Sequence, residues 1–149
     1  MLHTNYWDEF EYSKLKLLLH NEKIDSILDV RNGVKKADDY FPISVELHLT
    51  DCCNLNCEWC TDQKLRSNKA TLELAVIEKL FCEFGKSKTG VTLEGGGEPT
   101  LHPHFREVAE AGKRHGRDMG LISNGTVDFS DGGSKFKWVR ITLDYGTRE

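Results

Sequence analysis

Residues 43–60 have the sequence ISVELHLTDCCNLNCEWC, a β-strand pattern that runs directly into a cluster of cysteines. From residue 43 to residue 50, apolar and polar side chains alternate, which is the period of a strand with two different faces. Four of the chain's five cysteines follow before residue 61. This stretch therefore predicts the first strand of the fold and, directly after it, a loop that carries candidate functional residues.

Strand and helix patterns alternate after this stretch. Short apolar runs predict three more strands, and helical spacing of apolar residues predicts two helices between them. The predicted order is a strand at 43–50, a helix at 71–84, a strand at 90–94, a helix at 104–115, and strands at 119–123 and 138–144. This βαβαβ–β order is typical of an α/β domain with a parallel sheet.

Local signals predict the details of the first helix. Thr71 is its expected N-cap, and Cys82 is expected to be a small buried residue within it. Residues 125–137, in contrast, contain no clear amphipathic helix and are expected to form a loop. The buried stripe of the first helix is expected to consist of Leu72, Val76, Leu80 and Phe84.

Three of the four predicted strands carry a polar face. Central strands of an open parallel sheet are covered on both sides and tend to be apolar throughout. Polar faces are therefore better explained if they line the lumen of a partial (β/α) barrel, an incomplete TIM-like barrel, that holds a ligand. Exposed edge strands are the alternative. The polar sets are Ser44/Glu46/His48/Thr50, Thr92/Glu94 and Arg140/Thr142/Asp144, of which Glu46 and His48 are candidate substrate contacts.

The chain is expected to divide at Pro42. Residues 1–42 contain apolar residues at helical spacing, with a stop signal at Asn32-Gly33, and are predicted to form a helical N-terminal extension and linker. Residues 43–149 form the α/β unit, which breaks off after its fourth predicted strand. We therefore expect the sequence to be a fragment of a longer protein.

Composition excludes several classes of function. The 149 residues include 20 Lys and Arg against 24 Asp and Glu, so the net charge is −4. This balance argues against a nucleic-acid partner, because phosphate contacts need clustered basic residues. No apolar run is long enough to span a membrane, and the acidic, polar start is not a secretory signal. The expected location is the cytoplasm.

Cysteine spacing suggests a metal centre. Disulfides are rare in the cytoplasm, and Cys53, Cys57 and Cys60 form a C-x3-C-x2-C pattern of soft ligands for zinc, Cu(I) or an iron–sulfur cluster. A structural zinc site or an ordinary iron–sulfur centre needs four protein ligands. A cubane cluster held by three cysteines leaves one iron open. Cys52 is a possible fourth ligand, but adjacent residues of an extended chain point in opposite directions.

The cysteine pattern is accompanied by three further motifs at strand ends. They are Gly96-Gly97-Glu98-Pro99, Ser123-Asn124-Gly125-Thr126 and Ile141-Thr142-Leu143-Asp144. This combination resembles the N-terminal part of the core of the radical S-adenosylmethionine (radical SAM) superfamily over residues 43–149. Thr142 is a departure, since the family often has serine there, but it keeps the hydroxyl.

The resemblance implies a cofactor set. Cys53, Cys57 and Cys60 would hold a [4Fe–4S] cluster, and its fourth iron would bind S-adenosylmethionine. An electron donor such as flavodoxin or ferredoxin would reduce the cluster. The resulting 5′-deoxyadenosyl radical would abstract hydrogen from an unidentified substrate, with a small molecule or peptide favoured. By the same resemblance, the cofactor contacts are Trp59 beside the adenine, Gly96, Gly97 and Glu98 at the methionyl amino group, and Ser123 and Asn124 near the ribose or carboxylate. Thr142 is the remaining cofactor contact that the resemblance implies.

Two other classes of function stay open. One is a non-catalytic iron–sulfur or zinc-binding module in which Cys52 is the fourth ligand. The other is a degenerate scaffold that binds S-adenosylmethionine without cleaving it. Metal analysis distinguishes the first from the enzyme, and formation of 5′-deoxyadenosine distinguishes the second.

Overall fold

The computed structural model describes residues 21–66, 70–86 and 89–143. Its contacts divide the chain into two units, Met1–Ile43 and Ser44–Glu149, and each unit is described by itself. Among the described residues, no helix is both long and apolar enough to cross a bilayer.

The first unit contains helix α2 (Asn21–Arg31) and the short 3-10 helix η1 (Ala37–Asp39). The buried Lys23 amine of α2 donates hydrogen bonds to the backbone carbonyl groups of Phe41 (3.1 Å) and Pro42 (3.3 Å). These bonds tie the end of the unit back to the helix. Gly33 follows the helix with φ +73°, which is the left-handed conformation of a helix stop. The predicted helical residues Leu15, Leu18 and Leu19 lie outside the described residues.

The second unit is built on one parallel sheet. Its strands are β1 (Ser44–Leu47), β2 (Gly90–Leu93), β3 (Met119–Ser123) and β4 (Trp138–Ile141). Each strand pairs with the next one along the chain, so the order is β1-β2-β3-β4. This confirms the predicted four-stranded parallel sheet. Each new strand is added on the same side of the one before it, and the strand order never reverses. This is the arrangement of a (β/α) barrel, whereas the strand order of a doubly wound fold reverses once.

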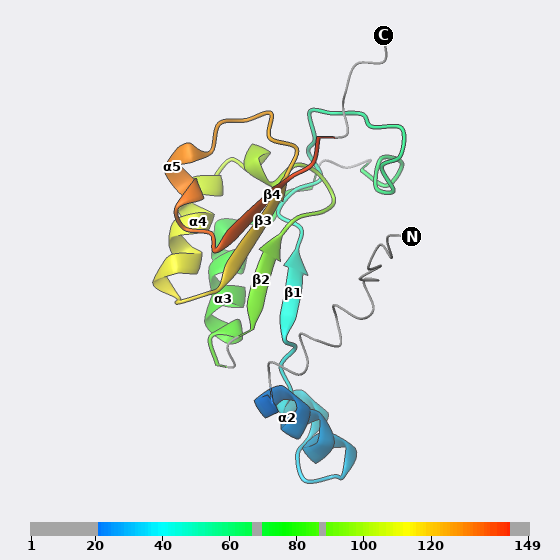
Figure 1. The fold of residues 1–149 in the computed structure, drawn as a ribbon, viewed down its shortest axis with the longest axis vertical. Helices are drawn as coiled ribbons and strands as arrows, with labels where there is room; N and C mark the ends of the chain where they lie inside the picture. The colour runs from blue at the N-terminus through cyan, green and yellow to red at the C-terminus, as the bar shows by residue number, and fades with distance from the viewer. Residues whose placement is uncertain (1–20, 67–69, 87–88, 144–149) are drawn as a thin grey trace, which may run out of the picture. The chain divides into compact units, whose positions relative to one another are not determined.

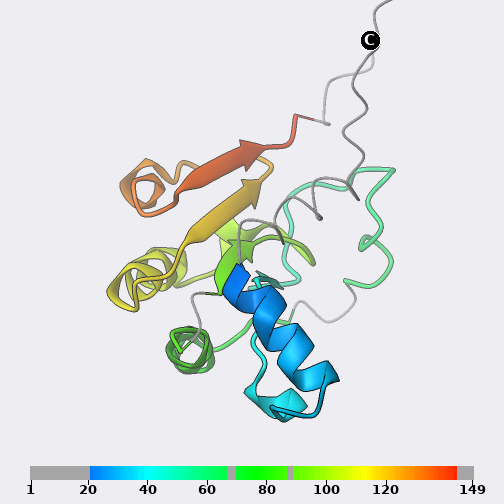
Figure 2. The same ribbon diagram turned by 60° about the horizontal axis from the view of Figure 1, so that its bottom comes forward.

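Helices cover one face of this sheet. Figures 1 and 2 show α3 (Leu74–Phe84), α4 (Phe105–Arg114) and the short α5 (Ser130–Gly133) on the same side of the strands. The hydrophobic core fills the space between these layers, because every second strand residue points toward the helices. Its fully buried members include Leu49, Ile77, Phe81, Val91, Leu93, Val108, Met119 and Leu121.

The polar positions of β1 and β2 alternate with these core residues. Leu47 and Leu93 are buried in the core, whereas Glu46 and Thr92 pair on the opposite face of the sheet. The polar face predicted for these strands is thus the face opposite α3, α4 and α5. Asp144, predicted to continue that face on the fourth strand, lies outside the described residues.

Four predictions about local structure were wrong. Thr71 does not cap α3, because it pairs with Thr50 in an antiparallel bridge and the cap is Glu73. Val76 is 44% exposed, since α3 is rotated so that Ile77 and Phe81 face the core. The same rotation leaves Cys82 exposed. Residues 125–137 contain one helical turn, α5, where only a loop was expected.

Candidate functional site

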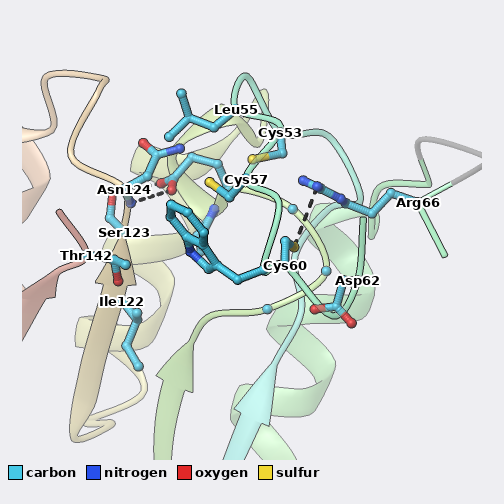
Figure 3. Close-up of a pocket in the computed structure, with 16 residues that line it drawn as sticks. Cys53, Leu55, Cys57, Cys60, Asp62, Arg66, Ile122, Ser123, Asn124 and Thr142 are labelled. Atoms are coloured by element: carbon cyan, nitrogen blue, oxygen red, sulfur yellow. Dashed lines mark hydrogen bonds between the residues drawn. The ribbon is translucent and has the colours of Figure 1, made fainter. Parts of the chain in front are cut away.

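A pocket lies at the carboxyl end of the sheet, where the loops after the four strands meet (Figure 3). All ten residues predicted to bind the cluster or S-adenosylmethionine line it. They are Cys53, Cys57, Trp59, Cys60, Gly96, Gly97, Glu98, Ser123, Asn124 and Thr142. The pocket also contains residues that the motifs did not indicate, namely Leu55, Asp62, Arg66, Gly95, Pro99 and Ile122. Segments about 90 residues apart in the sequence thus share one cavity.

The loop that follows β2 (residues 95–98, the glycine loop) packs directly against the loop that follows β1 (residues 51–60, the cysteine loop). A Cβ added to Gly97 would lie 2.0 Å from the backbone oxygen of Cys52, so no other residue fits without movement of the backbone. The amide of Gly97 donates to Thr50 O (2.8 Å), and the amide of Glu98 donates to Cys52 O (2.7 Å). Gly97 therefore has a steric role in addition to the cofactor contact predicted for it.

The Glu98 carboxylate is only 3% exposed and accepts four hydrogen bonds from the chain itself. Its Oε1 accepts from Thr100 N (3.1 Å), Thr100 Oγ1 (2.6 Å) and Ser123 Oγ (2.8 Å). Its Oε2 accepts from Asn124 N (2.7 Å). The carboxylate thus connects the start of the 3-10 helix η2 (Pro99–Leu101) to the end of β3. Since a carboxylate has about four acceptor sites, the remaining capacity for a cofactor amino group is on Oε2.

Ser123 and Asn124 are also engaged within the protein. The Ser123 hydroxyl donates to Glu98 and accepts from Gly125 N (3.0 Å). The Asn124 amide nitrogen donates to Asn54 Oδ1 (3.0 Å), and its oxygen accepts from Thr126 Oγ1 (2.6 Å). The serine proton is therefore already used, whereas Asn124 keeps one N–H for a ligand.

Asn54, Thr126 and Asn124 are hydrogen-bonded to one another. Asn54 Nδ2 donates to Thr126 Oγ1 (2.7 Å), so the residue next to Cys53 is fixed to the turn that follows β3. Sequence reasoning missed this link. The only available signal was an amide or hydroxyl residue at each of the two loops.

The donor set fits an iron–sulfur cluster in its chemistry. The thiols of Cys53, Cys57 and Cys60 are free, half-buried and on one side of the pocket (Figure 3). In the described part of the chain, no three metal-ligating side chains are arranged to hold a metal ion, so a cluster would draw the thiols together. Cys52 is not among the lining residues, which disfavours it as a fourth ligand.

Charged residues also lie on the sheet face opposite α3, α4 and α5. Burial raises the pKa of the Glu94 carboxyl, and the charge of Glu46 and a hydrogen bond with it raise this pKa further. The charges of Arg140 and His48 lower the pKa of Glu94. The ring of His48 lies where a side chain on Gly95 would be. His48 thus lies beside the lining residue Gly95, and contact of Glu46 or His48 with substrate stays a prediction.

A Glu94→Gln substitution is expected to stabilise the protein at pH 7. When folding raises the pKa of a carboxyl, the free energy of unfolding falls with rising pH. The fall begins at the pKa of the unfolded state, about 4.5, and ends above the pKa of the folded state. Glutamine does not ionise and so avoids this loss of unfolding free energy. The added stability of the variant should therefore disappear below about pH 4.5, where Glu94 is protonated in both states. Urea unfolding of both proteins at several pH values measures it. Equal pH dependence in both would contradict the prediction, and Glu46→Gln should lower the pKa of Glu94 in an NMR titration.

Comparisons with known proteins identify the family of this chain. A family profile described as the Radical SAM superfamily matches residues 47–149. The tungsten-containing aldehyde ferredoxin oxidoreductase cofactor-modifying protein of Pyrococcus furiosus is 30% identical over 83 residues, which are 54% of this chain and 23% of that protein. The probable GTP 3′,8-cyclase of Methanothermobacter thermautotrophicus is 33% identical over 86 residues, 57% of this chain and 28% of that protein. The chain thus spans about a quarter of the length of these relatives.

Solved structures show the same fold. The crystal structure of BtrN in complex with AdoMet and 2-DOIA superposes with a TM-score of 0.63 at 14% identity, and the match covers 74% of this chain and 49% of that one. The family profile covers most of the sequence, and it shows that the chain belongs to the radical SAM superfamily.

Proposed function

We propose that this chain is a radical SAM enzyme or the N-terminal part of one. Cys53, Cys57 and Cys60 hold a [4Fe–4S] cluster, and the same pocket binds S-adenosylmethionine. When bound and reduced by a donor such as flavodoxin or ferredoxin, this pair supplies a 5′-deoxyadenosyl radical that abstracts hydrogen from a substrate. The observation that carries the proposal is the single pocket in which the three thiols meet the glycine loop and the ends of β3 and β4.

The chain's own residues bind and orient the cofactor. Gly96 and Gly97 allow close approach to their backbone, and Trp59, whose side chain is 56% exposed, offers a ring for the adenine. Glu98 Oε2 accepts the methionyl amino group, and Thr142 offers its hydroxyl from the fourth strand end. Apolar Leu55 and Ile122 also line the pocket and exclude water, which protects a radical from side reactions.

The relatives support the class of reaction rather than one substrate. Their names include a cofactor-modifying protein, GTP 3′,8-cyclases, nucleotide dehydratases and the mycofactocin maturase MftC. The net charge of −4 favours a small molecule or peptide over a nucleic acid. We propose the cytoplasm as the location, since the cluster thiols must stay reduced.

Anaerobic reconstitution with iron and sulfide tests the proposal. We expect about four irons and four sulfides per chain, and an EPR spectrum of the reduced protein that changes when S-adenosylmethionine is added. Cys57→Ser should lose most of the iron. The matched control Cys82→Ser should keep it, because Cys82 is exposed on α3 and outside the pocket. Zinc without sulfide, or a spectrum that ignores S-adenosylmethionine, would contradict the enzyme and favour a metal-binding module.

A further inference from the structure

The segment that follows Cys57 coils back on itself. Backbone hydrogen bonds join Cys60 N to Cys57 O (3.1 Å), Gln63 N to Cys60 O (3.3 Å) and Arg66 N to Asp62 O (3.0 Å). These successive turns return Arg66 to the cysteine six positions before it. Its Nη2 lies 3.6 Å from Cys60 Sγ, within hydrogen-bonding distance for sulfur (Figure 3).

Arg66 is also the only basic residue among those that line the pocket in the described part of the chain. It is half-buried, so solvent screens its charge less than that of a free surface arginine. The two acidic lining residues are Asp62 and Glu98. Glu98 is occupied by four donors of the protein, as described above. The Arg66 guanidinium is therefore the one positive charge among the described lining residues, and it contacts the Cys60 thiol.

We propose that Arg66 is a positioning residue that sets the reduction potential of the cluster through Cys60. This inference rests on the proposed function. A cubane cluster on three thiolates is anionic, and one-electron reduction makes it more so. A positive charge and an N–H donor at a ligand sulfur both stabilise the reduced form more than the oxidised form, which raises the potential. Arg66 thus eases delivery of the electron that S-adenosylmethionine cleavage requires.

An EPR-monitored redox titration of the reconstituted chain with dithionite, without S-adenosylmethionine, tests this. Arg66→Ala should lower the equilibrium constant for reduction about tenfold, which is about 59 mV for one electron. Arg66→Lys, which keeps the charge, should lie near the wild type. Arg66→Gln, which keeps only an N–H donor, should fall between Lys and Ala. Lys64→Ala is the matched control, because Lys64 is an exposed cation of the same segment outside the pocket.

The reduction potentials of the Arg66 and Lys64 variants support or overturn the role of Arg66. A Lys64→Ala potential equal to the wild type, with the order Arg, Lys, Gln, Ala in the Arg66 series, supports the role. Unchanged potentials across the Arg66 series would overturn it while leaving the proposed function intact. If Arg66→Ala holds no iron, the Lys and Gln variants decide, and equal potentials for these two and the wild type overturn the inference. A wild-type chain that assembles no cluster would overturn the proposed function and this inference together.

Discussion

A Gly97→Ala variant is expected to lose about 3 kcal/mol of unfolding free energy and most of its capacity for iron. The added Cβ would lie 2.0 Å from Cys52 O and 2.6 Å from Asp51 C, both backbone atoms that cannot rotate away. Overpacking of this kind costs about 1–3 kcal/mol and occasionally more. Here the forced movement also stretches the two hydrogen bonds that hold the glycine loop against the cysteine loop. Urea unfolding and iron content after reconstitution measure both effects.

Gly133→Ala is the matched control for this substitution. Gly133 lies at the end of α5, away from the pocket, and its added Cβ would meet only Phe129 Cδ2 at 3.9 Å, an ordinary contact. We expect its stability to stay within about 0.5 kcal/mol of the wild type and its iron content to be unchanged. A Gly97→Ala protein with wild-type stability would show that the two loops separate without cost. The steric role assigned to Gly97 would then be wrong.

The sequence predicted the order of elements because periodicity is local. Alternation in β1 and apolar runs in β2 and β3 depend only on neighbouring residues, and four parallel strands followed from them. The errors concern contacts between distant residues. Thr71 has the composition of a helix cap, but its partner is Thr50, 21 positions away. Likewise, the face of α3 that is buried depends on where the sheet lies, which the residues of α3 do not encode by themselves.

The same limit applies to the candidate site. The strand-end motifs and the family resemblance indicated which residues gather in the pocket, and all ten line it. The motifs did not indicate which side chains the protein itself uses. Asn124 is bonded to Asn54 across 70 positions, and Arg66 returns to Cys60 through turns that leave no periodic pattern. Such partners become visible only when the loops are folded together.

Replacement of Glu98 by glutamine is expected to cost about 2 kcal/mol of unfolding free energy. A carboxylate only accepts hydrogen bonds, and all four partners of Glu98 are donors. Glutamine must turn its NH₂ group either toward Asn124 N or toward Thr100 and Ser123, so at least one buried donor loses its acceptor. Each such loss costs about 1–3 kcal/mol. Urea unfolding measures the change, and Glu98→Asp should also be destabilised because its shorter side chain cannot reach both loops.

Glu78→Gln is the matched control, because Glu78 pairs with Arg114 at the surface, where an ion pair contributes about 0–1 kcal/mol. The comparison also tests how Glu98 meets the cofactor. If the carboxylate mainly binds a methionyl amino group, Glu98→Gln should weaken S-adenosylmethionine binding and leave the cofactor-free chain as stable as the Glu78→Gln control. If it mainly joins η2 to β3, the cofactor-free chain is already destabilised. The four hydrogen bonds favour the second result, since they form without any ligand and already use most of the carboxylate's acceptor sites.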